Sequence, residues 1–122
     1  MKLHLSGPAG RNLFTGYGDG FALVNGQRQD RSVIVLPERM IPWELERFEA
    51  LAPSHFESLI DLRLEMLLLG TGNRLRFPHP RITAPLIQAR VGVEVMDIQA
   101  ACRTYNILAA EERRVGAALI FG

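Results

Sequence analysis

The second half of the chain alternates short apolar runs with helical patterns, and this alternation restricts the fold more than any other feature. Leu64 to Leu69 is a near-continuous apolar run of strand length, as expected for a strand covered on both faces. The pattern after it predicts a helix over 81–90, a strand over 93–96, a helix over 98–112 and a strand over 115–121. Such alternation is typical of parallel strands joined by right-handed crossovers.

The first half is punctuated by glycine and indicates β structure. Phe21 to Val24 is followed by Asn25-Gly26, a pair that tolerates positive φ at both central positions of a hairpin turn. The β-branched run from Ser32 to Leu36 predicts a further strand, which Pro37 ends. We therefore expect residues 1–36 to form a small antiparallel unit.

Residues 40–62 give a less regular pattern. Pro42-Trp43 favours a loop, with Trp43 and Phe48 packed down on the protein. Ser54 and Glu57 have the spacing of a capping box, which predicts a short helix from Ser54 to about Leu62.

Length and composition indicate one domain spanning residues 1–122. With 122 residues and 48% apolar content, the chain can build one ordinary core but not two. The predicted fold class is α/β with three layers and a mixed central sheet. Residues 54–122 supply its βαβαβ part, and residues 1–36 add the antiparallel unit.

Charge and cysteine content exclude several classes of protein. The formal net charge is +1, which gives no electrostatic argument for a nucleic-acid partner. A single cysteine excludes an intramolecular disulfide. No secretory or organelle-targeting pattern and no membrane-length apolar run occur in the sequence, so we expect a cytoplasmic protein.

Leu67 to Pro78 is the most site-like segment, because the buried run breaks into Gly70-Thr71-Gly72 and then two arginines, Arg74 and Arg76. Glycines at a strand exit let a ligand approach the backbone closely. A dinucleotide fingerprint would need a third glycine near position 75, where Leu75 stands, and a Walker loop would need Gly-Lys-Ser/Thr. A tight strand exit is therefore the simpler interpretation.

Ligands of parallel sheets bind beyond the carboxyl ends of the strands. Two loops leave such ends, 70–74 and 96–99, and they share one crevice if their strands are neighbours. The second loop opens a helix, whose amino end favours an anion. The predicted binding residues are Gly70, Thr71, Gly72, Asn73, Arg74, Arg76, Asp97, Arg103 and Asn106.

Asp97, Asn106 and Cys102 each allow two interpretations. Asp97 could cap the helix or act as a crevice carboxylate. Asn106 could be solvated, or its side-chain amide could have a specific role in mid-helix. Cys102 could be a small core residue or a reactive thiol, although a reactive thiolate prefers the first turn of a helix.

No catalytic signature accompanies these residues. The three histidines lack the spacing of metal ligands, and no nucleophile elbow, zinc-protease motif or paired-carboxylate motif occurs. The sequence therefore predicts no catalytic residue, no metal and no cofactor, and it favours binding over catalysis.

Three segments carry a resemblance to a known family. Leu67 to Pro78, Gly92 to Asp97 and Ala100 to Leu108 resemble the domain-of-unknown-function family that includes the mitochondrial complex I assembly factor 3 and the adipogenesis-associated domain protein. The resemblance implies a compact α/β fold with a mixed sheet and an additional β layer. It also implies a role in assembling a respiratory-type complex, and it carries over no catalytic residue.

Two hypotheses follow from the sequence. The first is a non-enzymatic binding or assembly domain with an unidentified protein partner, whose surface includes the 70–74 loop and the 97–103 helix start. The second is a small-anion site, or a minor enzyme acting on such an anion, in the same crevice. The sequence does not define the oligomeric state.

Overall fold

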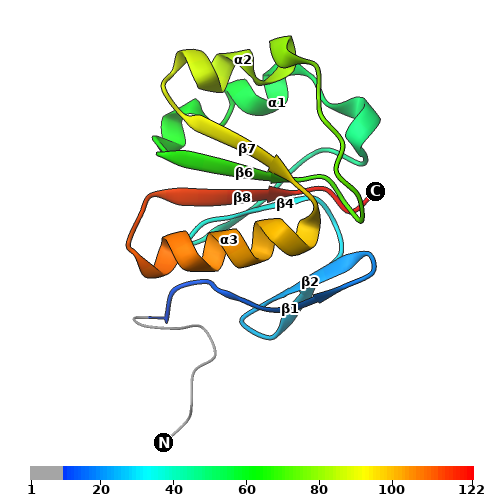
Figure 1. Ribbon diagram of the computed structural model, residues 1–122, viewed down its shortest axis with the longest axis vertical. Helices are drawn as coiled ribbons and strands as arrows, with labels where there is room; N and C mark the ends of the chain where they lie inside the picture. The colour runs from blue at the N-terminus through cyan, green and yellow to red at the C-terminus, as the bar shows by residue number, and fades with distance from the viewer. Residues whose placement is uncertain (1–9) are drawn as a thin grey trace, which may run out of the picture.

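The computed structural model describes residues 10–122, and the amino-terminal part of the expected antiparallel unit lies outside this range. The described residues form a mixed five-stranded sheet and a separate three-stranded sheet (Figure 1). The five-stranded sheet has the order β5-β4-β8-β6-β7. Its strands are β4 (Val33–Val35), β5 (Met40–Pro42), β6 (Met66–Gly70), β7 (Gly92–Met96) and β8 (Val115–Leu119).

Strands β6, β7 and β8 are parallel to one another, and β4 runs antiparallel to β8 and to β5. Helices α2 (Pro80–Gln88) and α3 (Ile98–Ala110) make the two crossovers of the parallel part. The predicted βαβαβ order and the mixed α/β fold are therefore confirmed.

Two apolar clusters lie on opposite faces of this sheet. Leu67 and Leu69 face α1 (Pro53–Glu57) and α2, whereas Leu68 faces α3 and the small sheet. All three leucines have no exposed surface. The near-continuous apolar run thus arises because β6 is covered on both faces.

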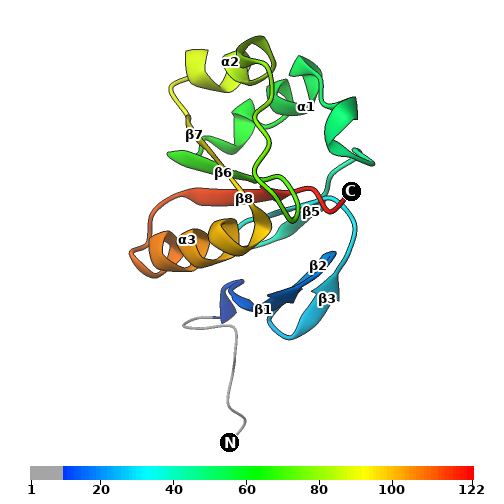
Figure 2. The ribbon, with the colours of Figure 1, turned by 45° about the vertical axis from the view of Figure 1, so that its right-hand side comes forward.

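The small sheet contains β1 (Phe14–Gly18), β2 (Phe21–Val24) and β3 (Gln27–Gln29), all antiparallel. Asn25 and Gly26 have φ of 50° and 83°, as a primed hairpin turn requires, so the predicted hairpin is confirmed. Figures 1 and 2 show this sheet on the α3 side of the molecule, apart from the central sheet.

The antiparallel unit is smaller than the predicted 1–36. Val33–Val35 belong to the central sheet, where they pair with β8 on one side and β5 on the other. All three residues are buried, and a strand buried on both faces belongs to the inside of a sheet. The expected loop at Pro42 is also wrong in part, because Pro42 ends the edge strand β5, a position where a missing amide is tolerated.

The predicted capping box of Ser54 and Glu57 is wrong. Helix α1 begins one residue earlier, with Pro53 in its first position, where proline is favoured because its fixed φ suits the helix. The Nδ1 atom of His55 accepts a hydrogen bond of 3.0 Å from the amide of Ala52. A short 3-10 turn at Ile60–Leu62 follows α1 in place of a continuous helix.

Candidate functional site

The exits of β6 and β7 lie side by side, because the two strands pair in parallel with Gly70 opposite Met96. Two backbone hydrogen bonds join the loops beyond them. The amide of Thr71 donates to the carbonyl of Met96, and the amide of Ile98 donates to the carbonyl of Gly72, each at 2.9 Å. The 70–74 loop and the start of α3 are therefore one connected structure.

A crevice of about 430 Å³ opens at this point, and three segments line it. Gly72 and Asn73 come from the first loop, and the segment from Asp97 to Gln99 comes from the start of α3. The third segment, Tyr17 to Asp19, comprises the end of β1 and the start of the turn to β2, and it closes the opposite side. The small sheet thus completes a crevice that the central sheet begins.

Hydrogen bonds tie this third segment to the other two. The side chain of Asn73 donates to the carboxylate of Asp19. Gln99 and Arg103 donate to the Tyr17 hydroxyl over 3.3 and 3.4 Å. These hydrogen bonds lower the pKa of the Tyr17 phenol, and the bond from Arg103 has a larger effect than the bond from Gln99. Arg103 therefore borders the crevice through Tyr17.

The side chain of Asp97 caps α3 and accepts a 2.8 Å hydrogen bond from the amide of Ala100. The capping interpretation of Asp97 is therefore confirmed, although the residue also lines the crevice. The lining contains two carboxylates, those of Asp19 and Asp97, and no arginine among the residues described. Its local charge does not resemble that of an anion-binding loop.

Gly70 and Thr71 contribute to packing instead of the crevice lining. A Cβ on Gly70 would lie 2.8 Å from Leu119 Cδ2 and 3.2 Å from Ala101 Cβ, so the glycine lets α3 lie close to the sheet. Thr71 is fully buried. Its hydroxyl donates to the Arg74 carbonyl at 2.8 Å and accepts from the Arg76 amide at 3.0 Å, which fixes the loop.

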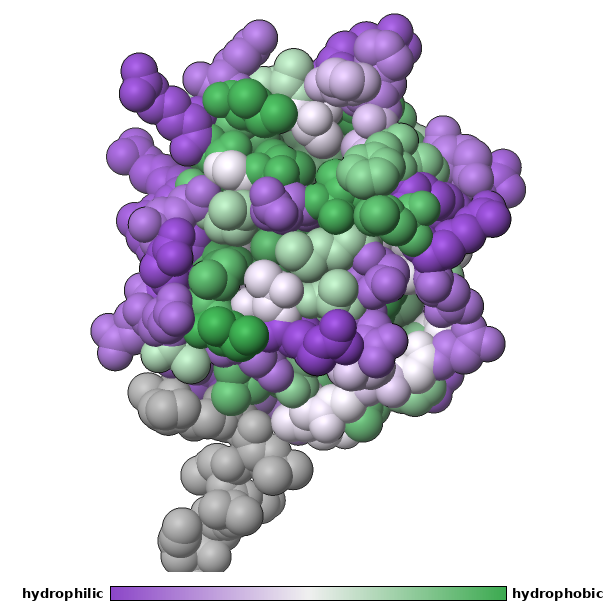
Figure 3. Space-filling model, viewed as in Figure 1, coloured by the Kyte–Doolittle hydropathy of each residue, from purple (hydrophilic) through white to green (hydrophobic). Residues whose placement is uncertain are grey.

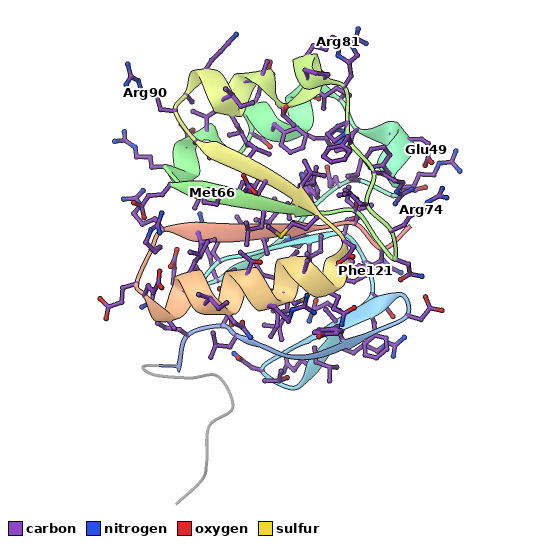
Figure 4. The ribbon with its side chains drawn as sticks, in the orientation of Figure 1. Glu49, Met66, Arg74, Arg81, Arg90 and Phe121 are labelled. Carbon is purple, nitrogen blue, oxygen red and sulfur yellow. The ribbon has the colours of Figure 1, made fainter. Side chains whose placement is uncertain are left out.

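The two arginines of the loop point elsewhere. The guanidinium of Arg76 donates to the carbonyls of Thr71, at 2.6 and 3.1 Å, and of Gly122, at 3.0 Å. It also lies 4.6 Å above the ring of Phe48. Arg74 is exposed and lies at the margin of the molecule, on the side of Glu49 (Figure 4). Neither side chain lines the crevice.

Asn106 has a structural role away from the crevice. Its Oδ1 accepts from the amide of Phe14 at 2.9 Å, and its Nδ2 donates to the carbonyl of Phe14 at 2.8 Å. The Asn106 side chain thus forms with Phe14 the two hydrogen bonds that the backbone of a neighbouring strand would otherwise form with β1. Of the two interpretations of Asn106, the structure supports the one in which its side-chain amide has a specific role.

Cys102 is buried, with 1% of its surface exposed. Burial raises the pKa of its thiol to about 12, so the core-residue interpretation holds in this structure. Within residues 10–122, no group of three or more His, Cys, Asp or Glu side chains is placed to hold a metal ion. None of the described helices is long and apolar enough to cross a membrane.

Sequence reasoning missed Tyr17, Gly18 and Asp19, which approach the crevice only through the tertiary fold. The available signal was a tyrosine and an aspartate within a glycine-rich segment, Gly16 to Gly20. A second hollow, of about 750 Å³, was also not expected. Its walls include Trp43, Glu46 and Phe121.

Fold and crevice together define a class: a single-domain α/β protein with a mixed sheet, a small additional sheet, and a crevice at the carboxyl ends of two parallel strands. The chain belongs to the family described as "Protein of unknown function (DUF498/DUF598)", whose model matches residues 14–120. The family resemblance seen in the sequence is thereby confirmed.

Solved relatives share the fold. A protein of Bordetella parapertussis has 41% sequence identity and a TM-score of 0.85, over 92% of this chain and 97% of its own. A Bordetella pertussis protein described as an Mth938-like domain has 35% identity and a TM-score of 0.80, over 98% of this chain and 92% of its own.

Among curated proteins, the chain is similar to NADH dehydrogenase [ubiquinone] 1 alpha subcomplex assembly factor 3 of Mus musculus. The two are 32% identical over 103 residues, which cover 83% of this chain and 55% of the mouse protein. The chain thus spans about half the length of the assembly factors that it matches.

Proposed function

We propose that this chain is a non-enzymatic binding domain that assists the assembly of a respiratory-type protein complex. The observation that carries the proposal is the crevice between Gly72, Asp97 and Tyr17. Its polar side chains form hydrogen bonds with one another or with the backbone, instead of pointing at a position where a substrate atom would react. The names of the assembly-factor relatives support an assembly role.

The geometry favours a protein partner over a small anion. The carboxylates of Asp19 and Asp97 line the crevice, and the guanidinium of Arg76 is bonded to the carbonyls of Thr71 and Gly122. The edge of the crevice is exposed at Asn73 and Gln99, where side-chain amides can donate to and accept from a partner.

Deletion of the gene in a host that also contains complex I tests the specific proposal. We expect reduced assembly of the complex on a native gel, restored by the wild-type gene. The variant Gln99→Arg, which places a long charged side chain at the crevice, is expected to restore assembly poorly. Gln27→Arg, a matched change on the exposed strand β3, should restore it fully. Normal assembly in the deletion strain would reject the assembly role.

A thermal-shift screen with phosphates, nucleotides and carboxylates addresses the small-anion alternative, because a ligand of the native state raises stability by mass action. The proposal expects no shift with any of them. A stabilisation that disappears in Arg103→Ala, at the border of the crevice, would instead favour the anion site.

A further inference from the structure

Strand β7 lies at the edge of the central sheet, with β6 as its only neighbour among residues 10–122. Edge strands present unpaired backbone groups, and proteins usually protect them by shortness, proline, bulges or charged side chains. The opposite edge follows this rule, because β5 has three residues and ends in Pro42. Strand β7 has five residues and no proline.

The register shows which backbone groups of β7 remain open. The amide of Gly92 donates to Glu65, and the carbonyl of Met96 accepts from Thr71, so Gly92 and Met96 face β6. Since backbone direction alternates along a strand, Val93 and Val95 turn their amides and carbonyls outward. No hydrogen bond from the backbone of Val93 or Val95 to a loop or side chain occurs within residues 10–122.

Part of the surface around this edge is apolar. Figure 3 shows apolar surface over β7 and its neighbours, interrupted by hydrophilic residues within this region and bordered by others at the margins. Four of the large apolar side chains exposed among the described residues belong to the 71–79 loop and to helices α2 and α3. They are Leu75 and Phe77 after β6, Ile87 on α2 and Ile107 on α3, with exposed fractions of 49, 71, 56 and 60%.

The negative charge of Glu94 favours some partners over others at this edge. Glu94 is exposed at the centre of β7 and forms no ion pair within residues 10–122. If the β7 strands of two copies paired antiparallel along their full length, Val93 would lie opposite Val95 of the other copy. The two Glu94 carboxylates would then be directly opposite each other. Like charges at that position are unfavourable, whereas a basic side chain is favourable.

We infer that β7 is a docking strand for an extended segment of a partner protein, which adds to the sheet edge and places a lysine or arginine opposite Glu94. Main-chain hydrogen bonds to Val93 and Val95 supply affinity, and alternate side chains supply specificity. This inference rests on the proposed binding function and names the form of the partner segment. The carboxyl end of β7 leads directly to Asp97 and the crevice.

A displayed library of 12-residue peptides, selected against the full chain, tests the inference. We expect enriched peptides with alternating β-branched or aromatic residues and a central basic residue. A selected peptide should bind Val95→Pro at least tenfold more weakly, because proline removes the outward amide and leaves the bonds to β6. Val95→Ala, which keeps that amide, should bind within about threefold of wild type.

Two further readouts keep the test independent of any folding defect in Val95→Pro. Selection against Glu94→Lys should enrich a central acidic residue instead of a basic one. Hydrogen exchange of wild type should show that the bound peptide protects the amides of Val93 and Val95.

Several results would overturn the inference: no enriched peptide, equal binding to Val95→Pro and Val95→Ala, or protection confined to other segments. A wild-type dimer that Val95→Pro dissociates would identify a second copy as the occupant and would also overturn it. If Val95→Pro restored assembly in the deletion strain while Gln99→Arg did not, the edge would be rejected and the proposed function retained.

Discussion

The side chain of Asn106 on α3 forms a pair of hydrogen bonds with both backbone groups of Phe14, which lies 92 residues earlier in the chain. The ring of Phe14 also packs edge-on against Tyr105, with ring centroids 5.1 Å apart. These contacts hold the small sheet on α3 and so keep Tyr17 and Asp19 at the crevice.

Replacing Asn106 by alanine should lower the free energy of unfolding by about 1–3 kcal/mol, because two partly buried backbone groups lose their partners. Urea denaturation measures this change. Asn73→Ala removes an exposed asparagine whose partner, Asp19, is also exposed, and it should change stability by less than about 0.5 kcal/mol. Equal effects of the two variants would contradict the role given to Asn106.

Arg76→Lys should destabilise the protein by about 1–2 kcal/mol, because one ammonium group cannot reproduce the planar set of bonds to Thr71 and Gly122 while stacking on Phe48. Glu49→Gln removes only the 3.7 Å ion pair between Arg76 and the exposed carboxylate of Glu49 and should cost less than about 1 kcal/mol. Thermal and urea denaturation of both variants provide the comparison, and a larger loss in Glu49→Gln would refute this assignment.

Cys102 should react slowly with iodoacetamide at pH 8 in the native protein and rapidly in urea. Burial suppresses the thiolate, since the pKa of this thiol is raised to about 12. Mass spectrometry of timed samples follows the reaction. Native alkylation as fast as that of a free thiol would restore the interpretation of Cys102 as a reactive thiol.

Glu65 should contribute to the acid sensitivity of folding. The backbone amide of Arg114 donates a hydrogen bond of 2.9 Å to the Glu65 carboxylate. This bond is the largest of the effects that lower the pKa of Glu65 below its ordinary value of 4.5. The contribution is therefore complete above pH 4.5 and is lost as the pH falls through the lowered value. Unfolding free energies at pH 3 to 6 should depend less on pH in Glu65→Gln than in wild type. Parallel curves would show that this hydrogen bond is irrelevant to acid unfolding.

The elements whose patterns are local were predicted well from the sequence. The apolar run of β6, the Asn25-Gly26 turn and the Asp97 cap each depend on neighbours within a few residues. The assignment of Val33–Val35 was wrong because strand propensity does not specify which sheet a strand joins. That choice was made by the pairing with β8, more than 80 positions later in the chain.

The candidate site was predicted only in part, for a related reason. Gly72, Asn73 and Asp97 follow neighbouring parallel strands, a relation that the order of elements implies. Tyr17 and Asp19 reach the crevice through the docking of β1 on α3, which depends on Asn106. The direction of Arg76 depends on Phe48 and the carbonyl of Gly122, and no local pattern shows either contact.

Affinity purification of the tagged chain from its own cells, with quantitative mass spectrometry, tests the central claim most directly. We predict a reproducible partner that is retained by wild type and by Gln27→Arg and depleted at least fivefold with Gln99→Arg at the crevice. The absence of any reproducible partner, or equal recovery of the partner with Gln99→Arg and wild type, would contradict the claim that this crevice is a partner-binding surface.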